Sequence, residues 1–205
     1  MTFIYFFDLL GTFAFAISGA LLGVRKEMDL YGYFVLAFVV ACGGGTIRDM
    51  MLNTSPFIFN DPNYLYVTVA AVVLVFLFNN RVEQKMKYLI WMDAVGLGVF
   101  TVIGATKAIS AGLGWYAVIL CAVLTSTGGG MIRDVLANEI PFVLSKEVYA
   151  SASILGAIIF LGFNKINFNS TLSILITAVV VIAVRMITFK RNKNLPRRHN
   201  KAKTV

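Results

Sequence analysis

Long apolar runs follow one another along this chain, separated by short polar segments. A helix that crosses a bilayer needs about 20 apolar residues, and fewer when flanking polar side chains reach the interface. The runs do not alternate polar and apolar positions as membrane β-strands do, so helices are favoured. The pattern predicts seven transmembrane helices, at about 3–22, 30–51, 63–78, 89–106, 113–136, 148–163 and 171–189.

The chain repeats itself at an offset of 85 residues. The segment Gly43-Gly44-Gly45-Thr46-Ile47-Arg48-Asp49 recurs as Gly128-Gly129-Gly130-Met131-Ile132-Arg133-Asp134. Three helices per copy is an odd number, so the two copies enter the membrane from opposite sides, as inverted repeats do in transporters and some channels. We therefore predict an all-α integral membrane protein with repeats at 1–85 and 86–167, an unpaired seventh helix at 168–189, and a basic tail at 190–205. The same offset relates Asp8 to Asp93, Gly19 to Gly104, Asn53 to Asn138, Phe57 to Phe142 and Tyr64 to Tyr149.

Composition supports a membrane protein and excludes a soluble domain. Hydrophobic residues make up 59% of the chain, charged residues only 14%, and the mean hydropathy is +0.80. A soluble domain needs more charged surface than this. The first apolar run has no basic start and no small-residue cleavage site, so we expect a retained helix rather than a signal peptide. Cys42 and Cys121 fall inside predicted helices and are expected to be free thiols used as small apolar residues.

The basic residues predict the orientation of the chain. Cytoplasmic connections carry an excess of lysine and arginine. One set of connections, which includes the tail, is much richer in these residues than the other. We expect the amino terminus outside and the carboxyl terminus in the cytoplasm of a bacterial cell. The net charge of +8 comes largely from the tail, so it does not indicate nucleic-acid binding. The tail, with the only histidine (His199), is expected either to attract anionic membrane lipids or to act as a disordered topology determinant.

The glycine triplets allow two interpretations. Three consecutive glycines weaken a helix by about 1 kcal/mol each relative to alanine and permit a kink or an unwound turn. Such a break is tolerated at membrane depth where it faces protein or a water-filled path. One interpretation is a broken second and fifth helix that lines a polar path. The other is close helix packing through small residues.

The charges at membrane depth are costly and should be paired or solvated. By depth, we expect Asp8 near Arg48 on the outer side and Asp93 near Arg133 on the cytoplasmic side, in preference to Arg48 with Asp134. These pairs either fix the helices or line the two vestibules of a pathway. Hydroxyl groups at Thr12, Ser18, Thr101 and Thr127 either replace part of a cation's hydration shell or bond back to their own helix. Lys107, whose counterpart is Leu22, is either a lysine reaching the interface or a gate or field sensor.

The doubled Gly-Gly-Gly-x-Ile-Arg-Asp motif, together with Asp8 and Asp93 near the start of each half, resembles a known family. It is similar to the bacterial branch of the trimeric intracellular cation (TRIC) channels, a domain also labelled glycine transporter or UPF0126. The resemblance covers about residues 4–189. It implies a homotrimer in which each protomer holds its own pore for potassium or sodium ions. It also implies that Gly43–Gly45 and Gly128–Gly130 are kink residues of the pore, with Arg48, Asp49, Arg133 and Asp134 beside it.

Three functions remain open at this stage. A passive channel for monovalent cations is the first. A secondary transporter of a small zwitterion such as glycine is the second, because broken helices in an inverted repeat serve that purpose as well. A membrane scaffold is the third. We expect no enzyme, no cofactor and no structural metal, because the sequence offers neither a metal-ligand cluster nor a Ser-His-Asp set.

Overall fold

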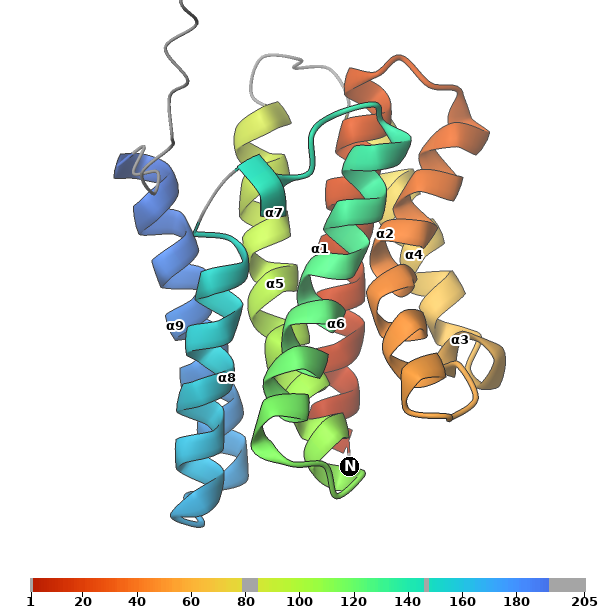
Figure 1. Ribbon diagram of the computed structural model, residues 1–205. Helices are drawn as coiled ribbons and strands as arrows, with labels where there is room; N and C mark the ends of the chain where they lie inside the picture. The colour runs from red at the N-terminus through yellow and green to blue at the C-terminus, as the bar shows by residue number, and fades with distance from the viewer. Residues whose placement is uncertain (1, 79–84, 146–147, 192–205) are drawn as a thin grey trace, which may run out of the picture.

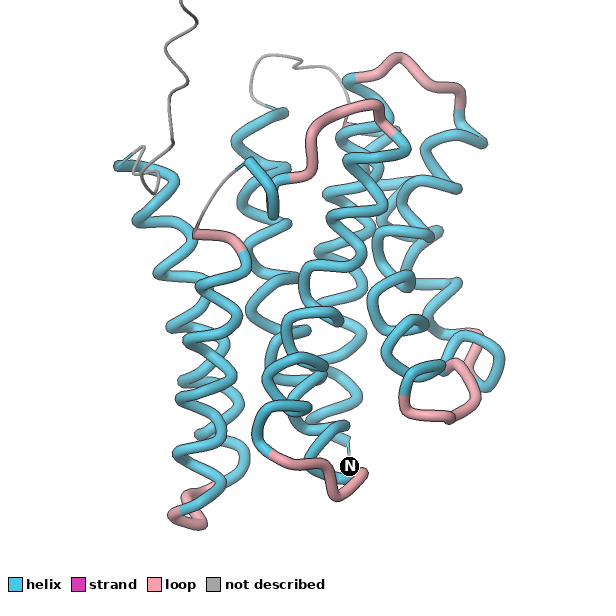
Figure 2. Tube along the Cα trace, viewed as in Figure 1, coloured by secondary structure: helices cyan, strands magenta, loops and turns pink. Residues whose placement is uncertain are grey.

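The computed structural model describes residues 2–78, 85–145 and 148–191, and these residues fold into a bundle of helices (Figures 1 and 2). The predicted basic tail and His199 lie outside the described residues, apart from Lys190 and Arg191. The long helices are α1 (Thr2–Arg25), α2 (Leu30–Met51), α4 (Asn63–Leu77), α5 (Lys85–Ser110), α6 (Trp115–Leu136), α8 (Ala150–Lys165) and α9 (Ser170–Arg191). Two one-turn helices, α3 (Phe57–Asn60) and α7 (Phe142–Ser145), precede α4 and α8.

Helix length and composition make this a multi-pass membrane protein. Five helices (α1, α2, α5, α6 and α9) are long and apolar enough to cross a bilayer. Helices α4 and α8 are also apolar, but they have only 15 and 16 residues. Each follows a one-turn helix that the sequence pattern did not predict, because four residues are too few to show a helical period.

The repeat in the sequence is a repeat in the structure. Helices α2 and α6 begin and end at residues 85 positions apart, and so do α3 and α7. Each of the two long helices is followed by an asparagine in the left-handed region, Asn53 with φ of 54° and Asn138 with φ of 55°. Asparagine tolerates this conformation better than most residues, which explains why the same turn closes both copies.

The two halves pack along the helices nearest the centre of the bundle. Helix α1 packs on α2, α4 and α5, and α5 packs on α1, α6 and α8. Phe15 of α1 and Phe100 of α5 are repeat equivalents, and their ring centres lie 5.1 Å apart. Both rings are almost fully buried. A residue that contacts its own repeat equivalent marks the axis that relates the halves, so this axis passes between α1 and α5.

The bundle has two ends that differ in composition. The amino terminus and α3 lie at one end, and α7 and the end of α9 lie at the other (Figure 1). We call these the α3 face and the α7 face. A hydrogen bond from the Tyr5 hydroxyl to Asp61 (2.6 Å) ties the start of α1 to the α3 face. Glu139 forms ion pairs with Lys26 (3.0 Å) and Arg25 (3.5 Å) on the α7 face.

The unpaired helix α9 contributes buried residues to the second half of the bundle. It packs on α5 and α8 and turns a stripe of buried residues toward them. Among these buried residues is Arg185, which is only 4% exposed. Helix α9 therefore contributes a buried charge to the second half.

Candidate functional site

A buried ionic cluster lies at the end of α6, near the α7 face. Arg133 donates from Nε to Asp134 (2.9 Å) and from Nη1 to Asp93 of α5 (2.5 Å). The same Nη1 lies 2.5 Å from the hydroxyl of Ser18 on α1. Asp93 and Arg133 are both 0% exposed. The predicted contact between Asp93 and Arg133 is confirmed, and it ties α6 to α5 in the low-dielectric interior.

Asp134 has a second structural role. Its other carboxylate oxygen accepts the backbone N–H of Phe142 (2.8 Å), the first residue of α7. The first N–H groups of a helix have no partner within the helix, so an aspartate placed there satisfies one of them. The motif thus positions α7 over the cluster. The Phe142 ring lies against Arg133, with its centre 5.1 Å from the guanidinium carbon.

The end of α2 repeats this arrangement near the α3 face. Arg48 donates to Asp49 from Nε (2.8 Å) and Nη2 (2.7 Å). Asp49 accepts the backbone N–H of Phe57 (3.1 Å), the first residue of α3. Asp8 of α1 accepts a hydrogen bond from the Tyr64 hydroxyl (2.9 Å), just as Asp93 accepts one from Tyr149 (3.2 Å).

The two clusters differ in the ion pairing of the first aspartate. Asp93 forms an ion pair with Arg133, but the described residues show no ion pair between Asp8 and Arg48. Asp8 and Arg48 still lie close enough for their charges to interact, so the prediction that they are near each other holds without a direct ion pair. Arg48 instead uses two of its nitrogens on its own neighbour Asp49, and Asp8 relies on Tyr64.

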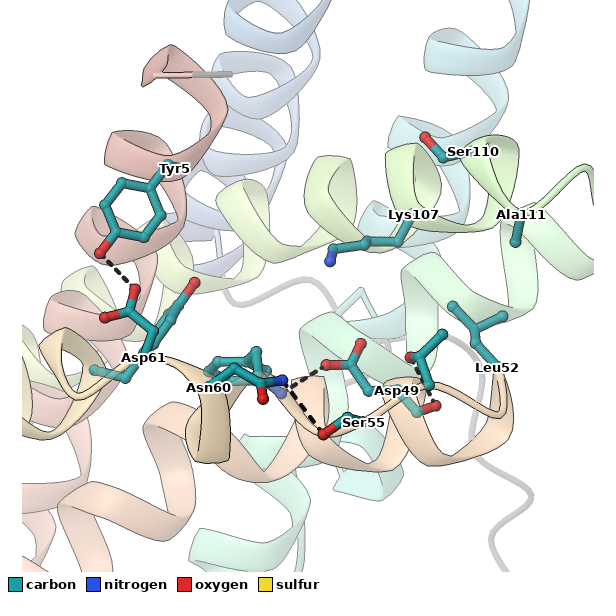
Figure 3. Close-up of a pocket in the computed structure, with 12 residues that line it drawn as sticks. Tyr5, Asp49, Leu52, Ser55, Asn60, Asp61, Lys107, Ser110 and Ala111 are labelled. Carbon is teal, nitrogen blue, oxygen red and sulfur yellow. Dashed lines mark hydrogen bonds between the residues drawn. The ribbon is translucent and has the colours of Figure 1, made fainter.

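A cavity of about 470 Å³ opens beside the first cluster, on the α3 face (Figure 3). Asp49, Phe57 and Tyr64 line its inner part, and Asp61 lines its rim. Figure 3 shows the Lys107 side chain of α5 pointing into the cavity, toward the space between Asp61 and Asp49. The hydrogen bond from the Tyr5 hydroxyl, with further help from the Asn63 backbone N–H, lowers the pKa of Asp61. This carboxylate therefore remains charged at the mouth of the cavity in mildly acidic medium.

The glycine triplets bring α2 and α6 together. A Cβ atom on Gly44 would overlap the carbonyl oxygen of Thr125, and a Cβ atom on Gly129 would overlap that of Val40. Val40 and Thr125 are themselves repeat equivalents, so the contact obeys the same two-fold relation as the Phe15–Phe100 contact. Only glycine allows the two backbones to approach this closely.

Neither helix is interrupted at its triplet, since both remain helical through Gly43–Gly45 and Gly128–Gly130. The expectation of an unwound turn is therefore wrong, because the helices keep their hydrogen bonding and use the glycines for packing. A bend without a break, as the kinked helices of the sequence prediction would have, stays a prediction.

The hydroxyl groups mostly bond to their own helices. Thr12 donates to Asp8 O (3.0 Å), Thr101 to Leu97 O (2.7 Å) and Thr127 to Val123 O (2.7 Å). Of the two interpretations that the sequence left open, these bonds match the one in which the hydroxyls bond back to their own helix. Ser18 of α1 is the exception, because its hydroxyl contacts Arg133 on α6.

Sequence reasoning missed a chain of hydroxyls in the second half. Ser153 Oγ on α8 lies 2.9 Å from Thr101 Oγ1 and 2.8 Å from Ser126 Oγ. All three side chains are completely buried. Their repeat equivalents are Ala16, Ala41 and Thr68, so the chain is not a repeated feature and the duplication could not have revealed it.

Sequence reasoning also missed the partners of the buried aspartates and the charge on α9. Tyr64 and Tyr149 were recognised as repeated residues, but nothing in the pattern assigned them to Asp8 and Asp93. Arg185 gave a signal that could have been followed, since it is the one charged residue within the seventh apolar run at 171–189. The described part of the chain holds no group of histidine, cysteine and carboxylate side chains able to bind a metal ion.

Comparison with known proteins supports the repeat and identifies the family. A family model described as "Glycine transporter" matches residues 5–80 and again residues 90–165. The two matches begin and end 85 residues apart, as the internal repeat does. Residues 5–80 hold the first triplet and the first Arg–Asp pair, and residues 90–165 hold the second.

Curated relatives come from several bacteria. A UPF0126 membrane protein of Vibrio cholerae is 40% identical over 195 residues, which cover 94% of this chain and 82% of the relative. A UPF0126 inner membrane protein of Escherichia coli K12 is 38% identical over 196 residues, which cover 94% of this chain and 95% of the relative.

Solved structures give the same answer. The TRIC trimeric intracellular cation channel orthologue from Rhodobacter sphaeroides superposes with a TM-score of 0.90 at 34% identity, covering 94% of this chain and 100% of the other. A prokaryotic TRIC channel crystallised in 0.5 M KCl gives a TM-score of 0.89 at 35% identity, covering 95% and 99%. The chain therefore belongs to the bacterial TRIC family, the same family as the UPF0126 membrane proteins.

Proposed function

We propose that this protein is a channel for monovalent cations such as potassium and sodium, with a pore in each protomer of a homotrimer. Seven spans would carry it across a bacterial inner membrane, with the amino terminus outside and the carboxyl terminus in the cytoplasm. The similarity to cation channels over nearly the whole chain supports this assignment. So does the description of the Escherichia coli relative as an inner membrane protein.

One observation carries the proposal. Two related clusters of arginine, aspartate and tyrosine lie near opposite faces of the bundle, and the triplets of α2 and α6 meet between them. Acidic side chains beside the α3-face cavity attract cations. Between the clusters, Gly44 and Gly129 bring the backbones of α2 and α6 into contact, so a small separation of the helices would expose carbonyl oxygens that can replace water around an ion.

Lys107 is the proposed gate of the α3-face cavity. Its amine is a positive charge that reaches into a cavity with Asp49 and Asp61 in its wall. A tethered cation of this kind competes with a passing ion, and its position responds to the membrane potential. Lys107→Gln should therefore weaken the voltage dependence of the open probability, and unchanged voltage dependence would exclude the lysine as the field sensor.

A secondary transporter of a small zwitterion such as glycine is the alternative. The description of the family model favours it. The α3-face cavity also holds an amine and carboxylates, which could bind the two ends of an amino acid. This function requires saturable uptake that depends on a coupling ion.

Recording from the purified protein in planar bilayers separates the two functions. In potassium chloride without other solutes, a channel should give unitary currents whose reversal potential follows the potassium gradient. Replacing chloride with gluconate should leave these currents unchanged. Proteoliposomes from the same preparation should then show no saturable glycine uptake. Saturable uptake without unitary currents would reverse the assignment.

A further inference from the structure

Arg185 is a buried cation for which the described residues provide no ion pair. It lies on α9, about two helical turns before the end of that helix at Arg191. Its guanidinium carbon lies 4.8 Å from the centre of the Tyr149 ring and 5.9 Å from that of Phe142. Its Nε is buried and has no hydrogen bond. Stacking on two aromatic faces is therefore the main compensation for burying this charge.

The two rings that Arg185 covers belong to the second ionic cluster. Tyr149 donates to Asp93, and Phe142 donates its backbone N–H to Asp134. Arg133 lies over the same Phe142 ring. The second cluster therefore has two arginines, one supplied by the repeat and one supplied by α9.

Among the described residues, the first cluster has no second arginine over its aromatic rings. Phe57 and Tyr64 are the repeat equivalents of Phe142 and Tyr149, and their ring centres lie 4.3 Å apart. Both of these rings line the open α3-face cavity. Since α9 has no repeat partner, the aromatic pair is covered in one half and faces a cavity in the other.

Formal charge differs between the two faces for the same reason. The first cluster holds Asp8, Asp49 and Arg48, a formal charge of −1, and the Asp61 and Lys107 charges at its cavity cancel. The second cluster holds Asp93 and Asp134 with Arg133 and Arg185, a formal charge of zero. At the α7 face, Glu139 is offset by both Arg25 and Lys26. The first cluster is therefore more negative than the second by one elementary charge.

We propose that Arg185 sets the direction in which cations pass most readily. Its guanidinium cancels the negative charge that the repeat would otherwise place at the α7-face mouth, and its stacking holds Tyr149 and Phe142 over Asp93 and Arg133. Cations collect at the α3 face and not at the α7 face, so current from the α3 face to the α7 face exceeds the reverse current. This inference rests on the proposed channel function.

The expected size follows from one elementary charge near a mouth. A unit charge about 10 Å away in water changes the local cation concentration by about twofold. We therefore expect the ratio of single-channel currents at equal and opposite voltages to change by about twofold in Arg185→Gln, toward unity. This change should approach that size at about 0.01 M potassium chloride, where the Debye length is about 30 Å, and should be mostly lost at about 1 M, where it is about 3 Å.

Two matched variants separate this effect from general ones. Arg185→Lys keeps the charge but loses the planar guanidinium, so it should keep the current ratio and lower the melting temperature. Arg191→Gln removes one positive charge from the exposed end of the same helix, and it should leave both quantities nearly unchanged.

The possible outcomes separate this inference from the proposed channel function on which it rests. Wild-type protein without unitary currents would overturn both. Wild-type currents with the same ratio in Arg185→Gln as in wild type, or with an equal change in Arg191→Gln, would overturn the role of Arg185 and leave the channel standing. If Arg185→Gln does not fold, the ratio of the wild-type currents at equal and opposite voltages is the deciding measurement. A ratio at unity, or one that does not respond to salt, excludes the proposal.

Discussion

Asp8 and Asp93 occupy equivalent positions in the two halves but have different partners. Asp93 accepts from Arg133 and Tyr149 and is 0% exposed, whereas Asp8 accepts from Tyr64 and is 9% exposed. Losing one member of a buried ion pair leaves a charge in the interior without compensation, which is more costly than losing a hydrogen bond from an uncharged donor. The two aspartates should therefore contribute unequally to stability, despite their common origin.

Asp93→Asn should lower the free energy of unfolding by about 2 kcal/mol or more, because Arg133 keeps only Asp134 as a charged partner. Asp8→Asn, the matched control, should cost about 1 kcal/mol. Thermal unfolding in detergent would measure both. The double variant with Arg133→Gln should be less destabilising than the sum of the single variants, with a coupling of about 1–3 kcal/mol. Strict additivity, or equal costs for the two aspartates, would contradict the asymmetry.

Single residues show where sequence reasoning reached its limit. Matching depths in oppositely inserted helices predicted that Asp93 lies near Arg133 and that Asp8 lies near Arg48. The first two residues form an ion pair, whereas Arg48 pairs with Asp49 instead. Depth fixes the level of a side chain along the membrane normal but not its rotamer. Arg48 had a second acceptor one residue away, and neighbours at that spacing do not normally face each other on a helix. Pattern reasoning therefore gave no reason to expect the contact that formed.

Among the elements, α2 and α6 show what a glycine run can do inside a helix. The sequence left open a break or a close approach, and the unbroken helices with touching backbones favour the close approach. Propensity alone could not decide between them, because both outcomes require glycine. The one-turn helices α3 and α7 were missed because their signal is a side chain from the preceding helix, Asp49 or Asp134, that binds their first N–H.

Alanine substitutions within the two triplets should separate packing from helix flexibility. Gly44→Ala and Gly129→Ala place a Cβ atom against a backbone carbonyl that cannot rotate away, and each should cost about 1–3 kcal/mol or more. Gly43→Ala meets the end of the Ile132 side chain at 3.0 Å, which can shift, and gains helix propensity of about 1 kcal/mol. Melting temperatures should therefore fall for the first two variants and change little for the third. A similar loss in all three would mean that flexibility, rather than close approach, requires the glycines.

The whole molecule combines a symmetric frame with features that break the symmetry. The axis is marked by Phe15 with Phe100 and by Gly44 with Gly129, and both contacts join repeat equivalents. Helix α9 with Arg185, and the hydroxyl chain at Ser153, have no counterparts in the first half. The duplication made the frame predictable from the sequence, whereas these additions required three-dimensional contacts.

Orientation is a property of the whole chain, since two oppositely inserted halves carry little directional information of their own. The unpaired α9 and the basic residues after it break this balance, because lysine and arginine are retained in the cytoplasm. Green fluorescent protein fused after Val205 should therefore fluoresce in a bacterial host, as it folds in the cytoplasm but not after export through the general secretion pathway. Green fluorescent protein fused after Asn167, between α8 and α9, should not fluoresce. Alkaline phosphatase fused at the same position should be active.

The contribution of the tail itself can be tested with charge changes alone. Replacing the basic residues of the tail with glutamine, in the fluorescent fusion, should lower the fluorescent fraction if these charges help to hold the carboxyl terminus inside. Replacing Arg25 and Lys26 as well should lower it further, because both lie on the same α7 face. Bright alkaline phosphatase activity from the Val205 fusion of the unaltered chain would place the α7 face outside and invert the direction proposed for the current.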